Sequence, residues 1–167
     1  MKYIKAAIAV IALVLLDQWT KVLAVTHLMN TNGVTIIPNV FRLYYLENRG
    51  SAFGLMQNQK IFFVIFTILV LAVLTLIYRK IPDTKRMLPL KIAGILIYAG
   101  AIGNFIDRVR QSYVVDFFYF ELINFPIFNV ADIYVTVAAF MFIILGLFYY
   151  KEEDFSLIFP DKKHENR

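Results

Sequence analysis

The chain of 167 residues contains no cysteine and only two histidines, His27 and His164. The absence of cysteine excludes disulfides, thiol nucleophiles and thiolate metal sites. Two histidines, one of them in the polar C-terminal tail, leave little from which to build a His-rich metal site or a Ser–His–Asp triad. Any chemistry must therefore use carboxylates, hydroxyls or lysines, and no metal or cofactor is expected.

Charged residues are few and segregated. Only 17% of the residues are charged, whereas 60% are hydrophobic and 16 are phenylalanine. Soluble domains contain roughly 45–50% apolar residues, so a soluble domain could not bury this much apolar surface. Lysine and arginine gather between the apolar stretches, and the formal charge of +5 therefore indicates membrane topology instead of a nucleic-acid partner.

Four apolar segments are long enough to cross a membrane, which takes about 20 residues. They are residues 3–25, 61–78, 88–106 and 130–150. The first resembles a cleavable signal peptide, but the polar run from Asp17 to Lys21 interrupts it and no small-residue cleavage site follows. The sequence therefore predicts an α-helical integral membrane protein with four transmembrane helices, forming a single domain over residues 1–167.

The distribution of lysine and arginine predicts the orientation of these helices. The cations cluster before the first span, between the second and third spans, and after the fourth; they are Lys2, Lys5, Arg79, Lys80, Lys85, Arg86, Lys91, Lys151, Lys162, Lys163 and Arg167. In a four-span protein these three regions share one side. We therefore expect both termini to be cytoplasmic and the connections over about residues 26–60 and 107–129 to face outward.

Both outer connections carry strand-like patterns. Partial period-two alternation of apolar residues over 34–45 predicts a small hairpin, and residues 113–128 are rich in β-branched and aromatic side chains. Aromatic side chains are also typical of the headgroup level of a membrane. We expect a small extracytoplasmic β hairpin that acts as a platform beside the helices.

Several polar residues lie inside the spans at a similar depth. With a rise of about 1.5 Å per residue, Asp17 lies about 18 Å beyond Lys5, and Asp132 lies about 28 Å from Lys151, in a hydrocarbon core about 30 Å thick. Asn104 lies about 20 Å beyond Lys91 by the same measure. All three are therefore expected in the outer half of the membrane. Ionisable residues inside a membrane, such as the two aspartates, usually have a function.

The acids differ in their sequence neighbours. Asp17 can pair with Lys21 four residues later, so a structural or helix-end role stands beside a catalytic one for it. Asp107 precedes Arg108 and is interpreted as mainly structural. Asp116 and Asp132 have apolar flanks, and burial together with a second carboxylate raises the pKa of a carboxyl group. They are candidates for a proton-sharing pair, as in aspartic proteases. The alternative is two independent polar residues, since a spacing of 16 residues neither requires nor forbids contact.

Other polar residues could surround such a pair. Asn48, Gly50, Asn104 and Asn129 could donate hydrogen bonds to a substrate or an oxyanion. Asn129 also suits a helix N-cap. Gly100 and Gly103 are typical of close helix packing.

Five short motifs in register resemble the lipoprotein signal peptidase (type II signal peptidase) family of bacterial aspartic proteases. They are "DQWTK" at 17–21, "NRGSAFG" at 48–54, "GAIGNFIDR" at 100–108, "VVDF" at 114–117 and "FNVAD" at 128–132. With the four spans, the resemblance covers nearly the whole chain.

The resemblance implies an intramembrane aspartic endopeptidase of the bacterial cytoplasmic membrane. Its substrate would be a prolipoprotein with a diacylglyceryl-modified cysteine, cleaved before that cysteine at the outer face to release the signal peptide. Asp116 and Asp132 would be catalytic. Substrate-binding or supporting roles are implied for Asp17, Lys21, Asn48, Gly50, Asn104, Asp107, Arg108 and Asn129. Membrane lipids are the other expected partners, nucleic acid is not, and the chain is expected to be monomeric.

Two other function classes remain open. A Ser–Lys membrane protease could use Ser51 with an outer lysine such as Lys60. A transporter or scaffold could use intramembrane acids as a proton or ion path, but such acids would be spread through the membrane depth.

Overall fold

The computed structural model describes residues 2–50 and 59–159. Four helices in it are long and apolar enough to cross a membrane: α1 (Lys2–Leu28), α2 (Lys60–Lys80), α3 (Leu88–Gln111) and α4 (Val130–Ile144), which continues as one π-helical turn, η3 (Leu145–Tyr149). The predicted four-span helical fold is confirmed.

Two helices end three or more residues beyond the end that hydropathy predicts. α1 continues to Leu28 instead of residue 25, and α3 continues to Gln111 instead of residue 106. Hydropathy locates the apolar part of a helix that lies in lipid. The helix itself continues as long as its backbone hydrogen bonds are formed, and these can extend into polar residues. α3 ends where Ser112 turns to φ 69° and its N–H donates to the Arg108 carbonyl at 3.1 Å. Asp107 therefore lies in the last turns of a helix and not in an outer connection.

α3 is the central helix, and α1, α2 and α4 each pack against it. Its buried positions are mostly small residues: Ala93, Gly94, Ala99, Gly100 and Gly103. Small side chains let neighbouring backbones approach closely, which is how membrane helices associate. A Cβ atom added at Gly100 would lie 2.5 Å from the Ala131 carbonyl oxygen of α4, so the interpretation of these glycines as packing residues is confirmed.

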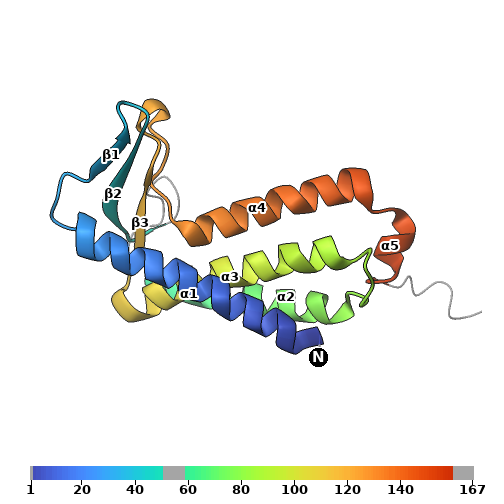
Figure 1. Cartoon of the computed structure of the whole chain (residues 1–167). Helices are drawn as coiled ribbons and strands as arrows, with labels where there is room; N and C mark the ends of the chain where they lie inside the picture. Colours follow the sequence, from blue (N-terminus) through green and yellow to red (C-terminus); the bar gives the residue numbers. More distant parts are fainter. Residues whose placement is uncertain (1, 51–58, 160–167) are drawn as a thin grey trace, which may run out of the picture.

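A three-stranded antiparallel sheet lies at one end of the helices, where α1 and α3 end and α4 begins (Figure 1). Its strands are β1 (Val34–Ile37), β2 (Phe41–Asn48) and β3 (Val114–Tyr119). The predicted hairpin, β1–β2, is confirmed, and β3 joins its second strand with Leu46 opposite Asp116 and Asn48 opposite Val114. This register brings Asn48 to the base of the sheet, beside the helix ends.

The opposite end of the bundle is closed by a short helix, α5 (Glu152–Ser156). Asp154 of α5 accepts two hydrogen bonds of 2.6 Å from Arg86 in the α2–α3 connection. These bonds lower the pKa of Asp154 to about 2. An apolar cluster lies beneath the pair and contains Ile81, Met87, Leu145, Tyr150 and Ile158.

Candidate active site

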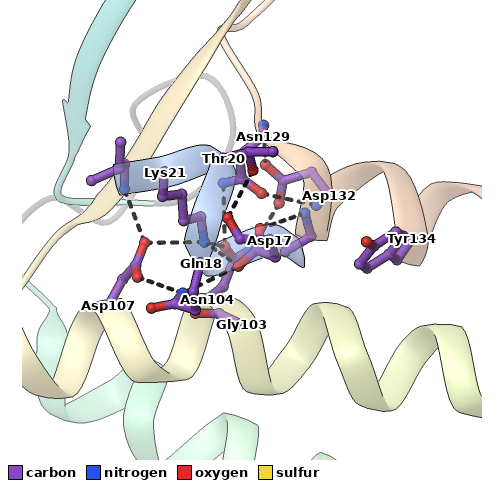
Figure 2. Close-up of polar contacts among 12 residues, drawn as sticks. Asp17, Gln18, Thr20, Lys21, Gly103, Asn104, Asp107, Asn129, Asp132 and Tyr134 are labelled. Carbon is purple, nitrogen blue, oxygen red and sulfur yellow. Dashed lines mark hydrogen bonds and ion pairs between the residues drawn. The ribbon is translucent and has the colours of Figure 1, made fainter. Parts of the chain in front are cut away.

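Four carboxylates from four different elements gather next to the sheet. Asp17 comes from α1, Asp107 from α3, Asp116 from β3 and Asp132 from the first turn of α4. Figure 2 labels Asp17, Asp107 and Asp132 and shows the polar contacts around them, with Asn104 on α3 and Asn129 at the start of α4. Residues separated by more than 100 positions in the chain therefore form one polar cluster.

Asn129 links Asp116 to Asp132. Its side-chain amide donates to Asp116 Oδ1 at 2.6 Å, and its backbone N–H donates to Asp132 Oδ2 at 3.0 Å. Its side-chain oxygen accepts from the backbone N–H of Asp132 at 3.0 Å, which completes a capping box at the start of α4. The N-cap expected from the sequence is thus present, and the same side chain also reaches Asp116.

Asp116 is 1% exposed, and each of its carboxylate oxygens accepts a hydrogen bond. The second donor is Asn48, at 2.8 Å from Oδ2. Burial, followed by repulsion from Asp132, raises the pKa of Asp116 from 3.8 to about 7, although the two asparagines act in the opposite direction. A carboxyl group with this pKa can hold a proton at neutral pH and release it in a reaction.

Asp132 is only half-buried and is held from two directions. The side-chain amide of Asn104, from α3, donates to its Oδ1 at 2.8 Å, while the Asn129 backbone holds Oδ2. Position three of a helix is also where the helix dipole favours a negative charge. Asp132 is therefore fixed in orientation but remains accessible from one side.

A second group of polar residues, Asp17, Lys21 and Asp107, forms a layer beside Asp116 and Asp132, and the buried cation Lys21 lies at its centre. Lys21 is 3% exposed and lies 3.0 Å from both Asp17 and Asp107. Its ammonium group also donates to Asn104 Oδ1 at 2.9 Å, which orients the amide of Asn104 towards Asp132. The predicted Asp17–Lys21 pair is present, but Asp107 pairs with this same lysine instead of with its neighbouring arginines.

The two acids of this layer also fix backbones. Asp17 Oδ1 accepts from the N–H of Ala131 at 2.9 Å, beside Asp132, and Asp107 Oδ2 accepts from the N–H of Val115 at 3.2 Å, beside Asp116. Each structural acid therefore anchors the residue that precedes one of the two candidate catalytic acids.

Gln18 is a member of this layer that sequence reasoning missed. Its amide donates to Asp17, Asp107 and the Gly103 carbonyl at 3.0 to 3.2 Å. Its position in the polar run from Asp17 to Lys21, inside an otherwise apolar helix, could have marked Gln18 as a member of the site.

Gly50 joins Asn48 to Arg108. Its N–H donates to Asn48 Oδ1 at 3.0 Å, and its carbonyl accepts from Arg108 at 3.4 Å. The Arg108 guanidinium lies 4.6 Å from the ring centroid of Phe63 on α2. All of the supporting residues expected from the sequence thus lie in one connected region around Asp116 and Asp132.

The rival serine protease site is only partly visible, since Ser51 lies outside the described residues. Lys60 donates to the Val109 carbonyl at 3.2 Å and to Ser112 at 3.1 Å, at the end of α3. Within residues 2–50 and 59–159, no group of three histidine or acidic side chains is arranged to hold a metal ion.

Two carboxylates joined by one asparagine, one with a pKa near neutrality, can act together as general acid and general base on a water molecule. The arrangement suits hydrolysis of an amide without a covalent intermediate.

Comparison with known proteins finds relatives over most of the chain. The family model described as signal peptidase (SPase) II matches residues 9–148. A lipoprotein signal peptidase of Streptococcus thermophilus is 43% identical over 154 residues, covering 92% of this chain and 97% of the relative. One from Caldanaerobacter subterraneus is 45% identical over 142 residues, covering 84% and 92% respectively.

A solved structure described as a bacterial membrane enzyme has the same fold. It superposes with a TM-score of 0.77 at 34% sequence identity, covering 89% of this chain and 92% of that one. A second such structure gives a TM-score of 0.75.

Proposed function

The chain belongs to the signal peptidase II family, and from this membership we propose that it removes the signal peptide from bacterial prolipoproteins whose cysteine carries a diacylglyceryl group. Members of this family are peptidases, so a transporter or scaffold role is set aside. In the proposed reaction the peptide bond on the amino side of the modified cysteine is cleaved at the outer face of the cytoplasmic membrane. Both termini are then cytoplasmic, and one chain supplies all of the catalytic groups.

The observation that carries the proposal is the double contact of Asn129 with Asp116 and Asp132. Two carboxyl groups held by one residue can share a proton, as the aspartic mechanism needs. The position of Asp132 in the first turn of a membrane-spanning helix adds support. The acyl chains of the substrate would hold its cysteine at the same membrane depth as Asp132, so the scissile bond would lie next to the two acids.

The two acids are assigned different roles. Asp116, which is buried and has a pKa of about 7, holds the shared proton. Asp132 carries the negative charge, supported by the Asn129 N–H and the N-terminal end of α4. Asp132 takes a proton from water, and the hydroxyl oxygen attacks the carbonyl carbon before the modified cysteine.

Asp116 donates a hydrogen bond to that carbonyl as negative charge develops on its oxygen. Collapse of the tetrahedral intermediate breaks the carbon–nitrogen bond, and a proton from the acid pair passes to the leaving amine. The products are the signal peptide with a free carboxylate and the lipoprotein with a free amine on its cysteine. Asn48 and Asn104 are positioning residues, because they contact the two carboxylates.

The proposal is tested with purified protein and one prolipoprotein in two forms, with and without the diacylglyceryl group, and with product masses measured. We expect cleavage of the modified form alone, directly before the cysteine. Asp132→Asn should be inactive, whereas Glu152→Gln, an exposed acid at the far end, should match the parent. Equal cleavage of both forms would contradict the lipid requirement, cleavage elsewhere would contradict the site, and an inactive parent would contradict the function.

A further inference from the structure

An apolar groove separates α1 from α2 at the end of the bundle opposite the sheet. Both helices pack against α3, and their direct contact with each other is slight. The groove has a volume of about 320 Å³, and its walls include Ala6, Ala7 and Val10 of α1, Tyr78 and Arg79 of α2, and Ile95 of α3. The two alanines leave room that larger side chains would fill.

The walls of the groove favour a hydrocarbon occupant. The hydroxyl groups of Thr75 and Tyr98 at its edge bond to each other and to the Leu71 carbonyl. A buried water needs two to four polar partners, and an apolar cavity without them stays dry. The α1 side extends from Tyr3 to Ile11, a length of roughly 12 Å along the helix axis, which suits part of an acyl chain.

Arg79, one of the residues that line the groove, adds a positive charge at this end of the molecule. Arg79 is the penultimate residue of α2, so its guanidinium lies at the end of the membrane span, at the headgroup level. It is exposed, and none of the ion pairs among the described residues includes it. A guanidinium is the side chain best matched to two oxygens of a phosphate group.

We propose that this groove is a binding site for an anionic phospholipid, with one acyl chain between α1 and α2 and the phosphate at Arg79. The basic residues at this end of the molecule match the negative charge of such a lipid. A signal peptide would fit less well, because the region before its apolar run is positively charged and would face Arg79. The groove lies at the opposite end from Asp116 and Asp132, so this inference does not depend on the proposed peptidase function.

The test measures retention of phosphatidylglycerol and phosphatidylcholine, with identical acyl chains, by native mass spectrometry of the purified full-length protein. Arg79→Gln should weaken phosphatidylglycerol binding about fivefold and leave phosphatidylcholine unchanged. Lys85→Gln removes an exposed cation at the same end but outside the groove, and it should change neither. Soluble glycerol phosphate should not compete, since it lacks the acyl chain.

A second variant tests the groove itself. Ala7→Leu adds a side chain to the α1 wall and should weaken the binding of both lipids, while the thermal midpoint stays near that of the parent. If Arg79→Gln and Lys85→Gln lowered phosphatidylglycerol binding equally, the attraction would be a general surface effect and the site would be refuted. Unchanged lipid binding in Ala7→Leu would also overturn the proposal.

Discussion

Asp116 is the residue whose titration should be most visible in the stability of the protein. The folded state holds its proton up to a pH of about 7, whereas the ordinary pKa is 3.8. Because the folded state binds this proton more tightly, the stabilising contribution is fully present below the ordinary pKa and is lost as the pH rises through about 7. Deprotonation leaves a buried carboxylate facing Asp132.

The pH dependence is measured as the thermal midpoint of the parent minus that of Asp116→Asn, which cannot titrate. We expect this difference to fall as the pH is raised from about 4 to about 8. Groups shared by the two proteins largely cancel, so the remaining slope belongs to the coupled acid pair. A difference that stays constant over this range would show that Asp116 does not hold a proton at neutral pH.

Lys21 is the residue on which the layer beneath the acids depends. Lys21→Met keeps the aliphatic stem but leaves Asp17 and Asp107 buried without a cation, at a cost of about 3–5 kcal/mol. We expect a large decrease in the thermal midpoint, whereas Lys85→Met, at an exposed position, should have little effect. Adding Asp107→Asn to Lys21→Met should recover part of the loss. If Lys21→Met melted with the parent, the charge network would not be structural.

At the scale of elements, the crossings of α3 with α1 and α4 set the position of the acids. A Cβ atom at Gly103 would lie 2.4 Å from Asp17 Oδ2, and one at Gly100 would lie 2.5 Å from the Ala131 carbonyl oxygen. Neither neighbour can yield easily, because one is a buried ion-paired carboxylate and the other is backbone. A side chain at Gly103 would therefore displace α1 with Asp17, and one at Gly100 would displace α4 and Asp132 with it.

Gly100→Ala and Gly103→Ala should each cost about 1–3 kcal/mol of stability and lower the cleavage rate. Gly146→Ala is the matched control, since a Cβ atom there would have no neighbour within 4 Å. Thermal midpoints and turnover of the three variants measure the effect. Equal behaviour of all three would mean that close packing at the crossings is unimportant.

The elements were predicted from the sequence better than their ends or their contacts. Hydropathy locates four spans because lipid imposes that pattern, but it does not see that α3 continues to Gln111. The Asp17–Lys21 pair follows from helix periodicity. The contact of Lys21 with Asp107 does not, because a spacing of 86 residues leaves no local signal. The bond between Arg86 and Asp154 was missed for the same reason.

In the candidate site, too, the sequence indicated the residues but not the contacts between distant segments. The apolar neighbours of Asp116 and Asp132 marked them as unusual acids, and the surrounding asparagines were already candidate hydrogen-bond donors before the motifs implied roles for them. That Asn129 holds both acids depends on how β3 approaches the first turn of α4, which no single segment encodes. The β1–β2 hairpin was visible as alternation, whereas the pairing of β2 with β3 is a tertiary contact.

At the scale of the whole molecule, the proposed orientation places the sheet outside the cell and the α2–α3 connection inside. The lack of cysteine makes this simple to test, because a single introduced cysteine is the only thiol. With a membrane-impermeant maleimide on intact cells, Thr35→Cys in β1 should be labelled and Lys85→Cys should not. After the cells are opened, both should react. Labelling of Lys85→Cys alone in intact cells would reverse the topology.

The most direct test of the central claim is turnover of a diacylglyceryl-modified prolipoprotein by the parent, Asp116→Asn, Asp132→Asn and Asp107→Asn at matched folded amounts. Asp116→Asn and Asp132→Asn should each bind substrate but lose turnover by at least about a hundredfold, since each removes one partner of the acid–base pair. Asp107→Asn should melt earlier yet keep measurable turnover. Full turnover in either Asp116→Asn or Asp132→Asn would contradict the two-carboxylate mechanism.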